Sequence, residues 1–209
     1  SAPICVGLVL GPSLSFHDHL RRELNGFLAT VDWAHHRDRD PVATVWHYDD
    51  PADQEVVGLI AATLAYGQVD LLTRATRRCL EPLGPRPAEY LRAHGAARLP
   101  SDFVYRMTRA EDLEALFRAI AAALRVHGSL QQLFREGFRL EHTDYRPALT
   151  HFVHALRGYG QSQRRGFHYL LADPAKQGAC KRLNLYLRWM IRGPDAIDLG
   201  LWDLPADRL

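Results

Sequence analysis

Lysine is rare in this chain, and its placement is the feature that most suggests chemistry. Of the 26 basic residues, only Lys176 and Lys181 are lysines. An arginine stays protonated, whereas a lysine amine can lose its proton when it is desolvated or lies beside other positive charge. Lys181 lies at the start of a predicted helix, so we consider it a candidate nucleophilic amine. The alternative is that this placement has no chemical role.

The predicted helix over residues 179–192 carries a polar face and a separate apolar face. Lys181, Asn184 and Arg188 are spaced i, i+3 and i+7, which places them on one side of a helix. The preceding turn contains Pro174 and Gly178. Because this turn leads into a helix N-terminus, the backbone N–H groups of Gly178, Ala179 and Cys180 are predicted to be free to bind phosphate. Arg182 and the helix N-terminus favour a neutral amine at Lys181. The alternative is an ordinary surface helix whose basic residues are solvated.

Helical periodicity and capping signals recur along the chain, and strand-like alternation is nearly absent, so we predict an all-α fold. Asp40 and Asp50 each precede a proline, which is typical of a helix start. Thr108 and Glu111 have the spacing of a capping box, and so do Ser129 and Gln132. Predicted helices cover residues 17–31, 51–65, 69–83, 87–94, 129–137, 145–157 and 179–192, and another follows Thr108 and ends near residue 126.

The length of 209 residues favours one domain or a pair of unequal size. The hydrophobic share of 47% is enough for a sizeable core. The net charge of +2 neither requires nor excludes a nucleic-acid partner. Three cysteines lie far apart without metal-type spacing, which is typical of a reducing cytosol. No apolar run reaches the roughly 20 residues that span a bilayer. We therefore expect a cytoplasmic monomer that is not bound to a membrane.

Two long stretches resemble the signature of a widespread bacterial family of conserved proteins of unassigned function. One is residues 178–190 (GACKRLNLYLRWM) followed by residues 197–202 (IDLGLW). The other comprises residues 50–56 (DPADQEV) and 64–67 (LAYG). The resemblance covers residues 17–209, and residues 1–16 are interpreted as a ragged N-terminal segment outside it.

That family more distantly resembles the helix-hairpin-helix DNA glycosylases of base-excision repair. Residues 61–68 (AATLAYGQ) are similar to the helix and break that carry the glutamine of those enzymes, which fills the gap left by a flipped-out base. Gln68 falls on that glutamine. Residues 170–181 (LLADPAKQGACK) are similar to their hairpin, and Lys181 falls on the lysine that attacks the sugar C1′ in the bifunctional members.

The resemblance implies a DNA glycosylase and AP lyase that flips a damaged nucleotide, with an oxidised purine as the expected lesion class. Lys181 would form a Schiff base with the sugar, and β-elimination would nick the strand. The hairpin N–H groups, with Arg182, Asn184 and Arg188, would contact the DNA backbone. The expected partner is damaged double-stranded DNA. No metal or other cofactor is expected, and there are too few cysteines for the iron–sulfur cluster of some relatives.

The sequence departs from the glycosylase pattern at two points. The hairpin has only Gly178 in place of a Gly-x-Gly pair. The catalytic aspartate of the glycosylases lies in a Pro-Val-Asp-Thr-His-like segment, and we expect its counterpart beyond Leu209. Asp195, Asp198 and Asp203 are the nearest carboxylates, but none has that sequence context. We therefore expect an incomplete domain of uncertain activity.

Aromatic and histidine pairs supply further candidates. Tyr66, Trp189 and Trp202 are candidates to stack on an extruded base, although aromatic residues at helical spacing usually belong to the core. His151 and His154 are spaced i and i+3, as metal ligands can be. A packed or solvated helix face is the preferred interpretation for this pair, and no metal site is predicted.

Two other functions remain open from the sequence. The chain could be a non-catalytic helix-hairpin-helix module that binds nucleic acid through its backbone groups. Alternatively, it could be a protein-interaction scaffold without a nucleic-acid role. Substitution of Lys181 separates the first from an enzyme, because a binding module would lose only modest, salt-sensitive affinity.

Overall fold

The computed structural model describes residues 15–176 and 178–209. Residues 1–14 of the predicted N-terminal segment therefore lie outside the described residues. Contacts divide the chain into two compact units, which meet in sequence between Trp33 and Ala34.

The first unit contains α1 (Phe16–Thr30), which Ser15 caps by accepting a hydrogen bond from the Asp18 backbone N–H at 3.3 Å. None of the residues of α1 is buried within this unit. Large apolar side chains along the helix, including Phe16 and Phe27, are exposed. Helix α2 (Trp33–Asp38) spans the junction of the two units.

The second unit is built from helices, and the predicted all-α class is confirmed. Its α-helices are α3 (Pro51–Leu64), α4 (Val69–Leu80), α5 (Pro87–His94), α6 (Ala110–His127), α7 (Leu130–Glu136), α8 (Arg146–Gly160), α9 (Arg165–Leu170) and α10 (Lys181–Ile191). Short 3-10 helices are η1 (Pro41–His47), η2 (Glu81–Leu83), η3 (Pro174–Lys176) and η4 (Ala206–Arg208). Strands β1 (Val104–Tyr105) and β2 (Thr108–Arg109) form a two-residue antiparallel pairing that the sequence did not predict.

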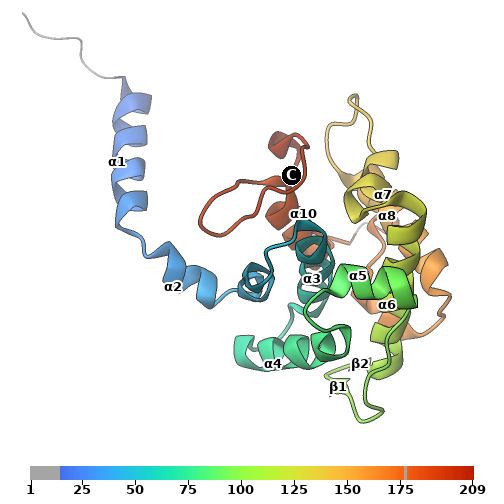
Figure 1. Ribbon diagram of the computed structural model, residues 1–209. Coiled ribbons are helices and arrows are strands. Elements are labelled where there is room, and N and C mark those ends of the chain that lie inside the picture. The colour runs from blue at the N-terminus through green and yellow to red at the C-terminus, as the bar shows by residue number, and fades with distance from the viewer. Residues whose placement is uncertain (1–14, 177) are drawn as a thin grey trace, which may run out of the picture. The chain divides into compact units, whose positions relative to one another are not determined.

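Helix α3 runs through the centre of this unit, and every residue from Val56 to Leu64 is buried. It packs against η1, α5 and α10, while α6 packs against α5 and α8 (Figure 1). Small residues in α3 allow this close approach. A side chain at Gly58 would meet the Met190 side chain of α10 at 3.0 Å. The packing of α10 on α3 fixes the helix that begins at Lys181.

The predicted caps are confirmed at three positions and wrong at one. The Asp40 carboxylate accepts a hydrogen bond from the Val42 N–H of η1, and the Asp50 carboxylate accepts one from the Ala52 N–H of α3. The Ser129 hydroxyl accepts one from the Gln132 N–H of α7. The predicted box at Thr108 is wrong, because α6 is capped at Arg109, whose N–H donates to Asp112 at 2.9 Å. Thr108 is instead buried in β2.

A buried carboxylate joins three distant segments of the unit. Glu55 of α3 accepts from the backbone N–H groups of Leu130 and Gln131 at 3.1 and 3.2 Å. It also accepts from Trp202 Nε1 at 2.6 Å. Burial raises the pKa of Glu55, while these bonds and the charge of Arg92 lower it. The contacts fix the start of α7 and the C-terminal segment to α3.

Among the helices of the described ranges, none has both the length and the apolar character needed to cross a bilayer.

Candidate functional site

Lys181 is the first residue of α10, and its side chain is exposed. The preceding residue, Cys180, adopts left-handed backbone angles (φ 43°, ψ 37°). Its carbonyl accepts from the N–H groups of Leu183 and Asn184. The connection between α9 and α10 therefore reverses sharply just before Lys181, which places the amine at the surface where the helix begins.

The two faces predicted for α10 are confirmed. Leu183, Leu187 and Met190 are buried, whereas Lys181 and Asn184 are exposed. Asn184 Nδ2 donates to the carbonyl of Ala179 at 2.9 Å and holds the turn against the helix. Asn184 therefore acts on the shape of the turn, and its predicted contact with DNA stays a prediction.

Arg182 is the residue through which α10 contacts the end of α3. Its guanidinium donates to the carbonyl of Thr63 at 2.6 Å and also to the carbonyl of Tyr169. The guanidinium carbon lies 4.1 Å from the centre of the Tyr169 ring and 5.1 Å from that of Tyr66. Burial lowers the pKa of Arg182, although its ordinary value is so high that it stays charged. Two of its donors are thus used inside the protein.

The predicted break between α3 and α4 is fixed by hydrogen bonds to the β1–β2 hairpin. The Tyr66 hydroxyl lies 2.7 Å from Thr108 Oγ1, and the Tyr105 hydroxyl donates to the Tyr66 carbonyl. Gly67 has a φ of 100°, at which any residue with a Cβ would be strained, and that Cβ would lie 2.7 Å from Arg106 Nε. Gln68 follows as the N-cap residue of α4, with an exposed side chain that makes no cap hydrogen bond.

These contacts bring together the two segments that carry the glycosylase resemblance. Residues 61–68 and 170–181 are more than 100 positions apart in the sequence, yet Arg182, which directly follows the second stretch, bonds to Thr63 and lies over the ring of Tyr66. The Tyr66 and Tyr169 rings also meet edge to face, with centroids 5.3 Å apart. Tyr66, Tyr169 and Arg182 form an aromatic and cationic cluster. The exposed Gln68 follows Tyr66 by two positions, and the exposed Lys181 directly precedes Arg182.

The two tryptophan candidates lie in the core. Trp189 is fully buried, and Trp202 is 2% exposed. The Trp202 ring packs edge to face on Tyr186, with centroids 5.4 Å apart. In this structure neither ring has a surface on which a base could stack. Tyr66, which is half-buried, is the one of the three aromatic candidates with access to solvent.

Asp198 is a candidate that the sequence pattern did not single out. Its carboxylate is fully buried, and Oδ2 lies 3.1 Å from Arg188 Nε and 3.3 Å from Arg192 Nε. Within the described part of the chain, Oδ1 has no hydrogen-bond partner. Burial raises the pKa of Asp198, while the bond to Arg188 and the charge of Arg192 lower it. The flanking Ile197 and Leu199 were a signal of burial that could have drawn attention to this carboxylate.

An arginine-lined cavity, which we call the arginine cavity, follows the polar face of α10. Its volume is about 460 Å³, and it lies between α10, the start of α8 and η4. The predicted site residues Gly178, Ala179, Cys180, Asn184 and Arg188 all line it. Three further guanidinium groups in its lining come from Arg146, Arg192 and Arg208. Lys181 lies outside this lining and contributes to a smaller neighbouring cavity with Cys180 and Arg182.

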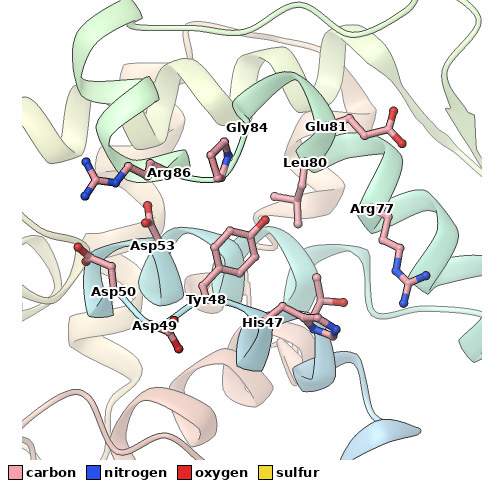
Figure 2. Close-up of a pocket in the computed structure, with 12 residues that line it drawn as sticks. His47, Tyr48, Asp49, Asp50, Asp53, Arg77, Leu80, Glu81, Gly84 and Arg86 are labelled. Atoms are coloured by element: carbon pink, nitrogen blue, oxygen red, sulfur yellow. The ribbon is translucent and has the colours of Figure 1, made fainter.

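A second cavity, the acidic cavity, lies at the N-terminal end of α3. Its volume is about 710 Å³, and Figure 2 shows Asp50 and Asp53 on the same side of it as Arg86. Asp53 is 5% exposed, and its Oδ1 accepts from the Ala88 backbone N–H at 2.7 Å. Other charged groups in the lining are those of Asp49, Glu81 and Arg77.

The histidine pair on α8 is held by ordinary side-chain contacts. His154 Nε2 lies 3.2 Å from Asp173 Oδ1, and His151 Nε2 lies 3.6 Å from Glu136 Oε2. No group of three or more His, Cys, Asp or Glu side chains with metal-binding geometry occurs within residues 15–176 and 178–209.

The comparison with protein families gives one match. A family described as "Protein of unknown function (DUF2400)" matches residues 40–208. The chain belongs to this family. The matched range contains α3, α10 and every candidate residue of the site, and it begins after α1. The expectation of a conserved family without an assigned function is therefore confirmed.

No curated protein matches this DUF2400 chain, and no solved structure matches it either. The helix-hairpin-helix resemblance is thus a prediction from the residues of the two segments.

Proposed function

We propose that this DUF2400 protein is a DNA glycosylase/AP lyase-like enzyme that acts on a flipped damaged nucleotide, with Lys181 as its nucleophile. One observation carries the proposal: Arg182 joins the end of α3, where Gln68 follows, to the start of α10, where Lys181 lies. A glutamine that fills a vacated base stack and an amine that attacks the extruded sugar must lie close together on one surface. The aromatic and cationic cluster beside them supplies a ring for stacking and positive charge for phosphate.

The reaction at an abasic site needs only an amine and a proton acceptor. Lys181 Nζ adds to C1′ of the open sugar, and water leaves to give a Schiff base. Loss of a C2′ proton then breaks the C3′–O bond, which releases the downstream strand with a 5′-phosphate. Water finally hydrolyses the Schiff base and frees the amine. On an intact damaged nucleotide, the amine first displaces the base at C1′, and the base leaves with a proton. The C1′–O4′ bond then breaks, the ring oxygen takes up a proton, and the opened sugar becomes the Schiff base.

We assign the carboxylate for base displacement to Asp198. Arg188, which holds its Oδ2, shares a helix face with Lys181 two turns away, about 10 Å along the axis. A carboxylate near the sugar stabilises the positive charge that develops at C1′ as the base leaves. The expectation of an aspartate beyond Leu209 stays a prediction.

The alternative is a non-catalytic nucleic-acid-binding module. The burial of Asp198 beneath Arg188 and Arg192 favours it, because a covered carboxylate cannot touch a sugar without movement of those arginines.

Borohydride trapping on duplex DNA with one abasic site tests the proposal. We expect a covalent adduct with the wild type and none with Lys181→Gln. Lys176→Gln is the matched control, since Lys176 is the other lysine of the chain, and it should trap as well as the wild type. An adduct that persists in Lys181→Gln, or no adduct from a folded protein that binds the DNA, would reject the lyase and leave the binding module.

Asp198→Asn separates the two chemical steps. The variant should still form the abasic-site adduct, because that step starts from a free aldehyde. It should lose excision of damaged bases, measured on duplexes that each contain one oxidised purine. If Asp198→Asn loses adduct formation and base excision equally, Asp198 acts only on the fold. Circular dichroism of the variant would then show a loss of helix.

A further inference from the structure

The arginine cavity has a charge pattern that the proposed reaction at Lys181 does not explain. Four guanidinium groups line it, from Arg146, Arg188, Arg192 and Arg208, against one lining carboxylate, that of Asp144. They come from α8, from α10 with its C-cap residue, and from η4, so helix spacing relates only Arg188 and Arg192. Asp198 pairs with Arg188 and Arg192, and Asp195 also pairs with Arg192. Within the described residues, Arg146 and Arg208 form no ion pair, so a bound anion would offset their charge.

Internal bonds fix the arginines and leave donors for a ligand. Asp198 engages Nε of Arg188 and of Arg192. Each guanidinium has five N–H donors, so those bonds use only part of its capacity. Arg208 donates from one nitrogen to the carbonyls of Leu140 and His142, which holds it at the cavity. Arg146 is exposed at the first position of α8.

We propose that the arginine cavity binds a phosphomonoester, the terminal phosphate of a nucleotide. A phosphomonoester carries about 1.5 to 2 negative charges at neutral pH, whereas a phosphate within a DNA strand carries one. Arginine binds phosphate through paired N–H donors, so several guanidiniums around one site select the doubly charged group.

The size and walls of the cavity suit a strand end or a free mononucleotide. A volume of about 460 Å³ lies within the range of small-ligand pockets. A continuous duplex offers its phosphates on a convex surface, which a concave site of this size does not enclose. Leu149, Leu187 and Pro174 add apolar wall on which a sugar or base can pack. A strand end and a free mononucleotide share this chemistry, and the experiment distinguishes them.

Binding of short single-stranded oligonucleotides by fluorescence anisotropy tests the inference. One oligonucleotide carries a 5′-phosphate, its twin carries a 5′-hydroxyl, and both carry a dye at the 3′ end. We expect the wild type to bind the 5′-phosphate form about tenfold more tightly. The preference should grow from about pH 5.5 to about pH 7.5, because the second proton of a phosphomonoester leaves near pH 6. Equal binding of the twins, with no competition by a deoxynucleoside 5′-monophosphate, would overturn the inference.

Variants locate the binding in the cavity. Arg146→Gln removes an exposed guanidinium from the lining and should lower the preference for the 5′-phosphate about tenfold. Arg125→Gln is the matched control, an exposed arginine of α6 outside the lining, and should retain the preference. A preference that survives in the double variant Arg146→Gln, Arg208→Gln would place the phosphate elsewhere and reject the proposal.

Competition identifies the source of the phosphate. If a deoxynucleoside 5′-monophosphate binds but the phosphorylated oligonucleotide does not, the ligand is a free nucleotide. If both bind, a strand end is accepted as well. Lys181→Gln should keep the phosphate preference, since Lys181 lies outside the lining. The two proposals can therefore fail separately. A wild type that binds the 5′-phosphate but forms no borohydride adduct would reject only the lyase. A wild type that forms the adduct without a preference for the 5′-phosphate would reject only the phosphate site.

Discussion

The two ends of α3 differ in charge although one helix connects them. At its N-terminal end, Asp50 and Asp53 line the acidic cavity (Figure 2). At its C-terminal end, the carbonyl of Thr63 accepts from Arg182, and the ring of Tyr66 lies beneath the same guanidinium. Every residue from Glu55 to Leu64 is buried.

This difference shows how a buried helix can separate two surfaces of opposite character. The 14 residues of α3 span about 20 Å, which exceeds the roughly 8 Å Debye length at physiological salt. We call the end at Asp50 and Asp53 the acidic end and the end at Arg182 the basic end. Because salt screens the charge over this distance, the acidic end repels an anion at the basic end only weakly. A polyanion that covered both ends would meet attraction at one and repulsion at the other, which orients it.

The largest expected effect comes from breaking the basic end with Arg182→Ala. The substitution removes the donors to Thr63 and Tyr169 and the guanidinium between two tyrosine rings. We expect a loss of about 2–4 kcal/mol in the free energy of unfolding, measured by urea denaturation. Arg165→Ala, at an exposed arginine of α9, should stay within about 0.5 kcal/mol of the wild type. Equal stability of the two variants would contradict the role given to Arg182.

A smaller effect is expected at the acidic end from Asp53→Ala. Asp53 accepts from the Ala88 N–H in the first turn of α5, which is the function of a capping residue. The expected loss is about 1 kcal/mol. Asp49→Ala, which changes an exposed carboxylate of the same cavity, should leave the urea midpoint nearly unchanged. A larger loss for Asp49→Ala than for Asp53→Ala would reverse this assignment.

The pH dependence of stability sharpens the comparison further. Burial raises the pKa of Asp53 above its ordinary 3.8, against the bond from Ala88. The folded state therefore binds a proton more tightly than the unfolded state. Relative to Asp53→Asn, the wild type should lose free energy of unfolding as pH rises from about 3.8 through the raised pKa. Denaturation series of both proteins across this range test the sign, and a relative gain with rising pH would contradict it.

The smallest effect concerns DNA affinity. Arg165 lines a cavity with Tyr169 and Arg182 at the basic end. Arg165→Gln should weaken binding to duplex DNA several-fold and reduce the salt slope by about one. Asp49→Asn, at the far end of α3, should change the affinity by less than about twofold. If the two substitutions change affinity equally, the ends of α3 do not act separately.

Local patterns in the sequence predicted most of the helices, because caps and apolar spacing act within a few residues. Pro87 to His94 was predicted with the bounds that α5 has, and the apolar face of α10 is buried as expected. The Thr108 box failed because a tertiary contact competes with it. The Thr108 hydroxyl pairs with Tyr66, and the cap lies one residue later, at Arg109. A two-residue strand pair is too short to leave a periodic signal.

The candidate site was less predictable, because its geometry depends on contacts across long sequence separations. Lys181, Asn184 and Arg188 could be placed on one helix by spacing alone. The contact of Arg182 with Thr63 could not, since no local pattern relates two positions so far apart. The same limit applies to Trp189 and Trp202, whose residue type suits both a core and a stacking surface. The arginine cavity combines three elements and has no sequence signature at all.

The Glu55 carboxylate also determines how parts of the molecule open. Amide hydrogens in the first turn of a helix normally exchange quickly with solvent, because no preceding carbonyl holds them. Here the amides of Leu130 and Gln131 are held by a side chain of α3, whose own position depends on Trp202. These two amides should therefore exchange only when α7 separates from α3. They would serve as probes of a cooperative opening that joins the middle of the chain to its C-terminal segment.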